Sequence, residues 1–246
     1  VFVTACLGGG TGTGAAPIVA EVDIAAGSIH LIAGARDETV VTVNPTNPSS
    51  KLDIEAAQKA RVEMSGSHLS VVVPKPGGIL AYVSFRDWGL VDVTIELPTG
   101  SSVDAKTGAG SFRADGEFGD VSARNGAGDI YVDRASARHL VSGAGRLTLE
   151  ASIGDALLVT AGDMEIGRIE GSAQVKNLNG RTRIGEVTGE AMIGILSQDY
   201  DDPRFDTTTA LDFGLDLTWR PSTRTRLTAS VERTLGETTL YDSDEG

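Results

Sequence analysis

The sequence predicts an all-β protein built as a β-solenoid (a β-helix-like fold), with coils of roughly 18 residues. Glycine supplies 31 of 246 residues and aromatic residues only 5%, which favours short strands and tight turns over a helical bundle. From residue 110 to residue 193, glycine recurs about every nine residues. Two and four residues after nearly every such glycine stands an apolar residue, the alternation of a strand with one buried face.

Residues 1–21 are predicted to be a glycine-rich leader. The apolar strand Val1 to Thr4 precedes a glycine-rich turn, and a short apolar segment follows from Ala15 to Glu21. The second unit, residues 22–193, is the predicted solenoid repeat domain. It begins with β-branched and apolar runs around Ile29 and from Val40 to Val43.

One helix is predicted, over residues 53–62, because this stretch is rich in Ala, Glu, Gln, Lys and Arg. Strands are predicted again over residues 69–73 and 91–97, the latter with clean alternation of apolar and polar residues.

The repeat itself is the strongest signal in the chain. Its markers are Gly110, Gly119, Gly128, Gly145, Gly154, Gly162, Gly171, Gly180 and Gly189, with Ala137 in the one missing position. The apolar pairs that follow them predict a ladder from Phe112 to Ile193, in which Leu147 and Leu149 are central core residues. His139 and Thr182 are the two polar members of this predicted ladder.

Charged residues fall between the predicted core positions. Arg113, Asp115, Arg124, Asp133, Glu150 and Lys176 are expected on the outer face or at corners. Asp129, Arg146, Asp163 and Arg181 occupy equivalent positions in successive coils and predict a charge ladder on a solvated corner. Because acidic and basic residues alternate in this stack, we expect no calcium site there, although calcium β-rolls also repeat at nine residues.

Residues 22–191 resemble a bacterial family of β-strand-repeat, adhesin-like proteins of unknown function. The resemblance depends on VDVTIELPTGSSVDAKTGAG (91–110), NGAGDIYVD (125–133) and NLNGRTRIGEVTGEA (177–191). It implies a solenoid-like fold and a place at the cell envelope or surface, and it implies no catalytic residues.

Residues 2–20 are similar to the phosphate-binding signature of FtsZ, the tubulin-like bacterial division GTPase. The resemblance implies that backbone N–H groups of the turn would hold nucleotide phosphates at a helix N-terminus. The matching residues are Gly8, Gly9, Gly10, Thr11, Gly12, Thr13 and Gly14. The remaining nucleotide-binding loops of that family are absent after Glu21, so we expect no GTP binding.

The third unit, residues 194–246, is predicted to hold an acidic loop, a β-hairpin and a flexible tail. Leu211 to Trp219 and Leu227 to Val231 alternate apolar with polar residues, the pattern of a hairpin of an outer-membrane barrel. The segment resembles outer-membrane porins linked to exopolysaccharide export. Two strands cannot close a barrel, so the hairpin is expected to cap the open end of the solenoid. Three resemblances in one chain suggest a composite sequence.

Composition narrows the function further. A net charge of −13 argues against a nucleic-acid partner. A single cysteine excludes internal disulfides, and three scattered histidines leave little for a metal site, so no cofactor and no metal is expected. No secretory signal is visible within these residues, and membrane association of this chain is not expected.

These observations favour a non-enzymatic structural or adhesin-like protein whose ligand and partners the sequence does not identify. Self-association through the solenoid ends or the hairpin stays open. Two alternatives also stay open: a GTP-binding protein using residues 8–14, and a component associated with an outer-membrane β-barrel.

Overall fold

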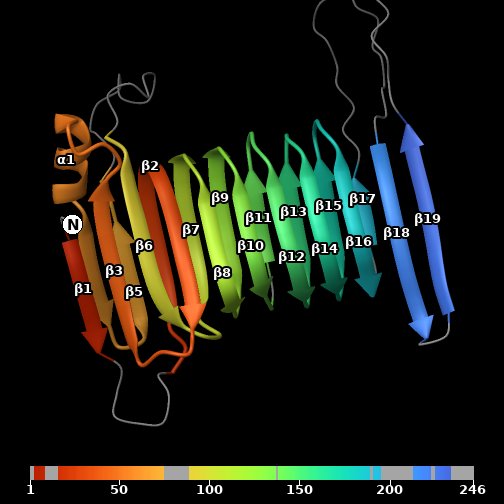
Figure 1. Ribbon diagram of the computed structural model, residues 1–246, viewed down its shortest axis with the longest axis horizontal. Coiled ribbons are helices and arrows are strands. Elements are labelled where there is room, and N and C mark those ends of the chain that lie inside the picture. The colour runs from red at the N-terminus through yellow and green to blue at the C-terminus, as the bar shows by residue number, and fades with distance from the viewer. Residues whose placement is uncertain are drawn as a thin grey trace, which may run out of the picture.

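The structure is a computed structural model, and it describes residues 3–8, 16–74, 89–136, 138–188, 191–194, 213–222 and 225–233. Within these residues the chain forms nineteen strands and one helix, so the all-β prediction is confirmed. The strands lie side by side along the long axis of the molecule, with helix α1 at one end and the β18–β19 hairpin at the other (Figure 1).

The strands form two sheets, named here sheet A and sheet B, which share one long strand, β2. Sheet A contains, in spatial order, β1 (Val3–Gly8), β3 (Glu38–Pro45), β6 (Val91–Pro98), the second half of β2 (Val19–Gly34), β8 (Phe112–Phe118), β10 (Ile130–Ala135), β12 (Leu147–Ile153), β14 (Met164–Glu170), β16 (Thr182–Thr188), β18 (Phe213–Ser222) and β19 (Thr225–Arg233). Sheet B contains β4 (Arg61–Ser65), β5 (His68–Val72), the first half of β2, β7 (Ser102–Ala109), β9 (Val121–Ala127), β11 (Arg138–Ser142), β13 (Ala156–Thr160), β15 (Ala173–Asn177) and β17 (Ala191–Gly194).

From β7 to β17 the chain alternates between the two sheets, and each strand from β7 to β16 pairs in parallel with the strand two places later. In sheet A the register partners are Phe112, Ile130, Leu147, Met164 and Thr182, which are 18, 17, 17 and 18 residues apart. Sheet B shows the same progression from Val103 through Val121. This arrangement is β-helix-like, as the repeat predicts.

Glycine stacks form the corners where the chain passes from sheet B to sheet A. Gly110, Gly128, Gly145, Gly162 and Gly180 lie one above another. A Cβ on Gly145, which has φ +137°, would lie 2.2 Å from the carbonyl oxygen of Gly128. Only glycine fits such a corner, because both the backbone angle and the close approach exclude a side chain.

At the opposite corner the missing glycine position is occupied by Ser136, one residue before the predicted marker. The Ser136 N–H donates to the Gly119 carbonyl, and a Cβ on Gly154 would meet the Ser136 carbonyl oxygen at 2.6 Å. The strand that follows is therefore displaced by one residue, and Leu140 (0% exposed) faces the core. The predicted pair of His139 and Val141 was wrong, since both side chains are only half-buried and alternate with Leu140.

The interior of the coils is filled by the predicted ladder wherever its side chains are described, apart from that displaced pair and Thr182, which is only half-buried. Leu147 and Leu149 are fully buried, while Arg146 is exposed and Thr148 is half-buried. The predicted outer residues Arg113, Arg124, Glu150 and Lys176 are exposed. The alternation in the sequence thus identifies the core face of the regular coils.

The N-terminal end of the solenoid is closed by α1 (Lys51–Gln58), which packs against β3 and β6. Ser50 is its N-cap and accepts a hydrogen bond from the Asp53 N–H. The prediction of a helix over residues 53–62 was wrong at both ends, because the cap starts the helix earlier and Arg61 begins β4. β4 and β5 form an antiparallel hairpin at the edge of sheet B.

The predicted domain boundaries stay predictions, and two strands lie close to them. β2 runs without interruption from Val19 to Gly34, so it continues past Glu21. At the other end, β18 and β19 form the predicted antiparallel hairpin, and β18 pairs in parallel with β16 at Glu186 and Thr218. The hairpin therefore continues sheet A.

Candidate functional site

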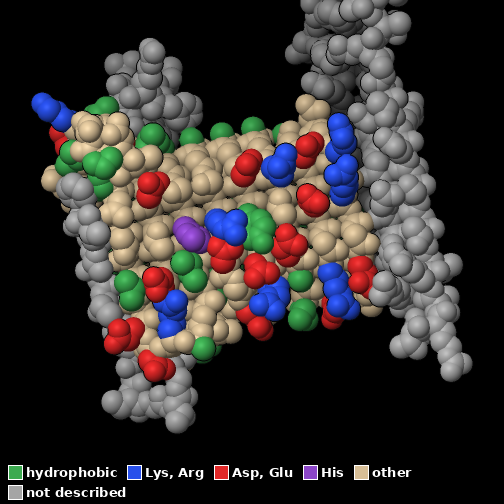
Figure 2. Space-filling model, in the orientation of Figure 1, with side chains coloured by type: hydrophobic (Ala, Val, Ile, Leu, Met, Phe, Trp, Pro, Cys, Tyr) green, Lys and Arg blue, Asp and Glu red, His purple; other side chains and the backbone are tan. Residues whose placement is uncertain are grey.

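The outer face of sheet A carries one continuous row of side chains across eight strands. In register order they are Thr42, Thr94, His30, Arg113, Tyr131, Thr148, Glu165 and Arg183. All of them are half-buried or exposed. Figure 2 shows a histidine and charged side chains of both signs gathered over this face of the coils. A flat, hydrogen-bonded sheet holds these groups at the regular spacing of its strands.

The centre of the row is a polar cluster around Asp115. The Arg113 guanidinium donates to both carboxylate oxygens of Asp115, Nε to Oδ2 and an Nη to Oδ1, each at 2.7 Å. His30 Nε2 lies 2.7 Å from Asp115 Oδ2. The Arg113 guanidinium also covers the Tyr131 ring, 4.3 Å from its centre. This geometry combines a bidentate ion pair with a cation–π contact, so the four side chains fix one another.

The ionisation of this cluster follows from its contacts. Burial alone raises the pKa of the Asp115 carboxyl, but hydrogen bonds from Arg113 and His30 outweigh burial and hold this pKa below its ordinary value. The hydrogen bond to Asp115 raises the pKa of Arg113, and burial raises the pKa of the Tyr131 hydroxyl. At neutral pH the cluster therefore contains an anion, a cation and an uncharged phenol.

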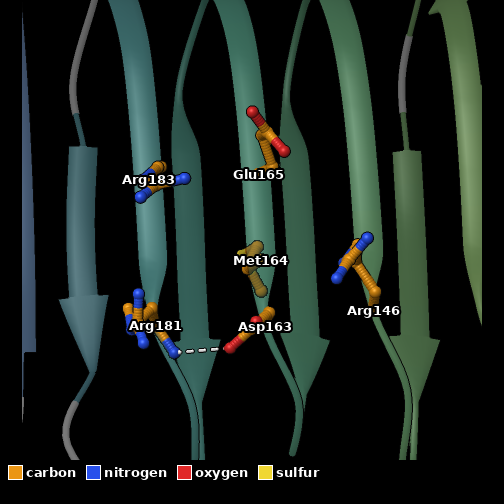
Figure 3. A pocket seen from close by; sticks show the side chains of 6 residues that line it. All are labelled: Arg146, Asp163, Met164, Glu165, Arg181 and Arg183. Atoms are coloured by element: carbon orange, nitrogen blue, oxygen red, sulfur yellow. Dashed lines mark hydrogen bonds between the residues drawn. The ribbon is translucent and has the colours of Figure 1, made fainter.

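A shallow hollow of about 210 Å³ lies farther along the solenoid, at the corner that leads into β12, β14 and β16. Its lining residues are Arg146, Asp163, Met164, Glu165, Arg181 and Arg183 (Figure 3). Arg181 and Arg183 lie on one side, Arg146 on the other, and Asp163 and Glu165 between them. Met164 is buried, and the other five side chains are exposed.

The aspartates of this corner bond to backbone rather than to guanidinium groups. Asp129 Oδ1 accepts the Arg146 N–H at 2.8 Å, and Asp163 Oδ1 accepts the Arg181 N–H at 3.0 Å. The four residues of the predicted charge ladder do stack in successive coils. Their carboxylates, however, hold the next coil in place through its backbone, and the guanidinium groups are left facing the hollow.

The glycine-rich segment is only partly described. Gly8 is the last residue of β1, while Gly9, Gly10, Thr11, Gly12, Thr13 and Gly14 lie outside the described residues. After them, residues 16–18 are not helical and β2 begins at Val19. From residue 16 on, the chain thus lacks the helix whose N-terminus would support bound phosphate in the GTPase signature.

A buried polar ladder was not predicted from the sequence. Asn125, Ser142 and Thr160 occupy equivalent positions in successive coils and are at most 3% exposed. Each donates a side-chain hydrogen bond to a corner carbonyl of the preceding coil, on Gly110, Gly128 and Gly145 respectively. The signal in the sequence was a small polar residue six positions after each corner that leads from sheet A to sheet B. These corners are Gly119, Ser136 and Gly154. These residues satisfy corner backbone groups, so they belong to the scaffold.

Across the residues that the structure describes, no three His, Cys, Asp or Glu side chains are grouped so that they could hold a metal ion. The acidic cluster of Asp199, Asp201, Asp202 and Asp206 lies outside those residues. None of the helices in the described part of the chain has the length and apolar character needed to cross a membrane.

This chain is similar to a family model and to solved structures. Residues 171–244 match the family model described as "Putative beta-barrel porin 2". The fold is also similar to the crystal structure of a putative adhesin from Bacteroides fragilis, with 12% sequence identity and a TM-score of 0.42, covering 78% of this chain and 90% of that one. The porin match includes β15, β16 and β17, which pair in parallel with the preceding coils, as well as the antiparallel β18–β19 hairpin.

Proposed function

We propose that this chain is a non-enzymatic, adhesin-like β-solenoid of the bacterial cell envelope, with coils of about 18 residues, that presents the outer face of sheet A to a ligand. The observation that carries the proposal is the row of polar and charged side chains in register across eight strands. Such a row suits an extended partner, because it offers one accessible side chain at every strand.

The composition of the interior supports placing the ligand-binding site on the outer surface. The core is an apolar ladder, and the buried hydroxyl and amide groups of Asn125, Ser142 and Thr160 are already engaged with corner carbonyls. Polar chemistry that a partner can reach therefore lies on the outer faces. The central Arg113–Tyr131 contact offers an aromatic ring and a cation together, a combination common in binding surfaces.

The test measures binding of the labelled protein to an array of bacterial and host polysaccharides. The same measurement is then repeated with one variant on each sheet face. Tyr131→Ala changes the sheet A face, and Gln174→Ala changes the sheet B face at an exposed residue. We expect binding to weaken about tenfold in the first variant, which corresponds to the loss of an aromatic contact of about 1.4 kcal/mol. Binding should be unchanged in the second variant. An array without any bound sugar, or equal loss in both variants, would contradict the proposal.

A second candidate function is a component associated with an outer-membrane β-barrel. The porin family match over residues 171–244 and the antiparallel register of β18 with β19 favour it. Its test is partition into lipid vesicles with and without residues 211–233. Stable insertion that depends on this hairpin would favour the barrel component over the adhesin-like scaffold.

GTP binding is the alternative that we expect to fail. Isothermal titration with magnesium and GTP should show no saturable binding, because the phosphate-binding turn is followed by strand β2 in place of a helix. The control is Gly12→Trp, which should leave the titration unchanged. Saturable binding that this variant abolishes would restore the GTPase interpretation.

A further inference from the structure

We propose that the hollow lined by Arg146, Asp163 and Arg181 binds a linear acidic polysaccharide that carries a carboxylate on every second sugar, with the polymer lying along the solenoid axis. The inference deepens the proposed function and rests on it. It names a ligand class for one end of the sheet A surface.

The first step is the state of the guanidinium groups. Arg146, Arg181 and Arg183 are exposed, and no described carboxylate lies within ion-pair distance of any of the three side chains. Arg113, by contrast, is fully occupied by Asp115. In a chain of net charge −13, the hollow combines three cations with two anions and is locally positive.

The second step is that the corner is rigid. The Arg146 and Arg181 backbones are held by the aspartate of the preceding coil through their N–H groups. Their carbonyls accept the N–H groups of Ile130 and Met164. The fixed backbone sets where each side chain begins, and the planar guanidinium can bind a carboxylate in bidentate geometry.

The third step is the order of charges along the axis. Arg146, Asp163 and Arg181 occupy the same corner position in three successive coils, so the two arginines are about 9–10 Å apart at the usual strand spacing. A polymer whose sugars are spaced like neighbouring strands would place alternate sugars at the two arginines. The sugar between them would face Asp163, which repels a carboxylate and accepts hydrogen bonds from hydroxyl or amide groups.

The fourth step concerns Arg183, which faces outward on β16 two residues after Arg181. It adds a second donor group beside Arg181, which is the corner residue directly before β16 (Figure 3). The hollow thereby accepts an anionic oxygen group most strongly at the β16 side. We expect this side to anchor the polymer.

The experiment measures the affinity of the whole chain for three octasaccharides of equal length by titration calorimetry. Hyaluronan carries a carboxylate on alternate sugars, oligogalacturonate carries one on every sugar, and dextran is uncharged. We expect hyaluronan to bind more tightly than oligogalacturonate, and dextran not to bind. Binding should weaken as salt is raised, because exposed charges are screened.

Variants then assign the binding to the hollow. Arg146→Gln and Arg181→Gln should each weaken hyaluronan binding by about tenfold, as loss of a charged hydrogen bond does. Arg124→Gln is the matched control, because it removes the same charge from an exposed position on sheet B. All these side chains are exposed, and a thermal melt of each variant verifies that it is folded.

One further variant tests the role assigned to Asp163. Asp163→Asn keeps an acceptor oxygen for the Arg181 N–H, removes the negative charge and replaces the second oxygen by an NH2 donor. We expect oligogalacturonate to gain more affinity than hyaluronan, so that the preference between the two polymers narrows. An equal gain for both would overturn the proposed alternation.

Other outcomes overturn the proposal as a whole. The first is equal affinity of the unmodified chain for hyaluronan and oligogalacturonate. The second is a loss of hyaluronan binding in Arg124→Gln as large as that in Arg181→Gln. The third is an oligothymidylate, of the same net charge as the hyaluronan octasaccharide, that binds as tightly as hyaluronan does. If the hollow fails while another sugar binds through Tyr131, only this inference is lost. If no sugar binds at all, the proposed function is lost with it.

Discussion

The regular coils and the N-terminal end of this molecule use the same two sheets but fix them by different means. In the coils, every strand pairs with one that is 17 or 18 residues away, as Leu147 does with Ile130 and Met164. At the N-terminal end, β2 pairs Ile29 with Val93 and Val22 with Ala105, which are 64 and 83 residues apart. One region is organised by its repeat, and the other by contacts between distant segments.

The difference teaches where a sequence repeat is sufficient to determine structure. In the coils, each glycine corner holds the chain against the corner of the coil before it, so the local spacing sets the register. At the N-terminal end, α1 and the antiparallel strands β3 and β4 cover the first coil. The sheets therefore end here in antiparallel strands, with β1 outermost in sheet A and β4 outermost in sheet B.

The largest expected effect is in the core of the coils. Leu149→Ala should lower the free energy of unfolding by about 2–5 kcal/mol, because it leaves a cavity in a close-packed ladder. Thr148→Ala, on the opposite face of the same strand, is the control and should change it by less than about 0.5 kcal/mol. Urea unfolding measures both. Equal tolerance at the two positions would mean that the register is mistaken.

Two glycine-to-alanine variants compare the stability of the two regions directly. Gly145→Ala places a Cβ 2.2 Å from the Gly128 carbonyl oxygen at φ +137°, so we expect a loss of about 3 kcal/mol or more. Gly66, in the β4–β5 turn, has φ +59° and open space around it, and Gly66→Ala should cost only about 1–2 kcal/mol. Thermal unfolding of both variants measures the difference. Similar losses would show that the corner stack gives way more easily than its geometry indicates.

Substitution of Asp53 tests what stabilises the N-terminal end. It is 5% exposed, and its carboxylate accepts hydrogen bonds from the Asn47 and Leu90 N–H groups, at 3.0 and 3.1 Å. Asp53→Ala should cost about 1–3 kcal/mol, because it leaves these donors without their acceptor. Glu55→Ala, exposed on the same helix, should be close to neutral. Hydrogen exchange should show the loss at α1 and β3 first, and protection lost uniformly along the coils would contradict a local role.

The sequence predicted the coils better than their ends for a physical reason. Alternation identifies buried residues such as Leu147, and glycine spacing identifies corners, because both are local consequences of backbone geometry. The prediction failed at His139, where Ser136 takes the stacking position and displaces the next strand by one residue. It also failed at Arg61, where pairing of β4 with β5 overrides helix propensity.

The candidate site was predictable only in part. The alternation of Asp129, Arg146, Asp163 and Arg181 was visible in the sequence, but their backbone hydrogen bonds were not. The cluster of His30, Arg113 and Tyr131 joins β2 to β8 and β10, which come much later in the sequence. No local pattern relates His30 to Asp115, which lies 85 residues later.

The smallest expected effect is a pH dependence of stability, which arises from a carboxylate on the outer face of the coils and not from their apolar core. Because the pKa of Asp115 is lower in the folded protein than its ordinary value of 3.8, its ionised form stabilises the fold. This contribution is complete above the unfolded pKa and is lost as the pH falls through the lower folded value. Asp115→Asn should therefore be less stable than the unmodified chain near neutral pH, and the difference should vanish in acid. Asp155→Asn, at an exposed carboxylate, is the control for a general charge effect. Melting curves of the three proteins from neutral to acidic pH measure it, and a difference that persists below the folded pKa would show that the amide perturbs packing rather than removing an ion pair with Arg113.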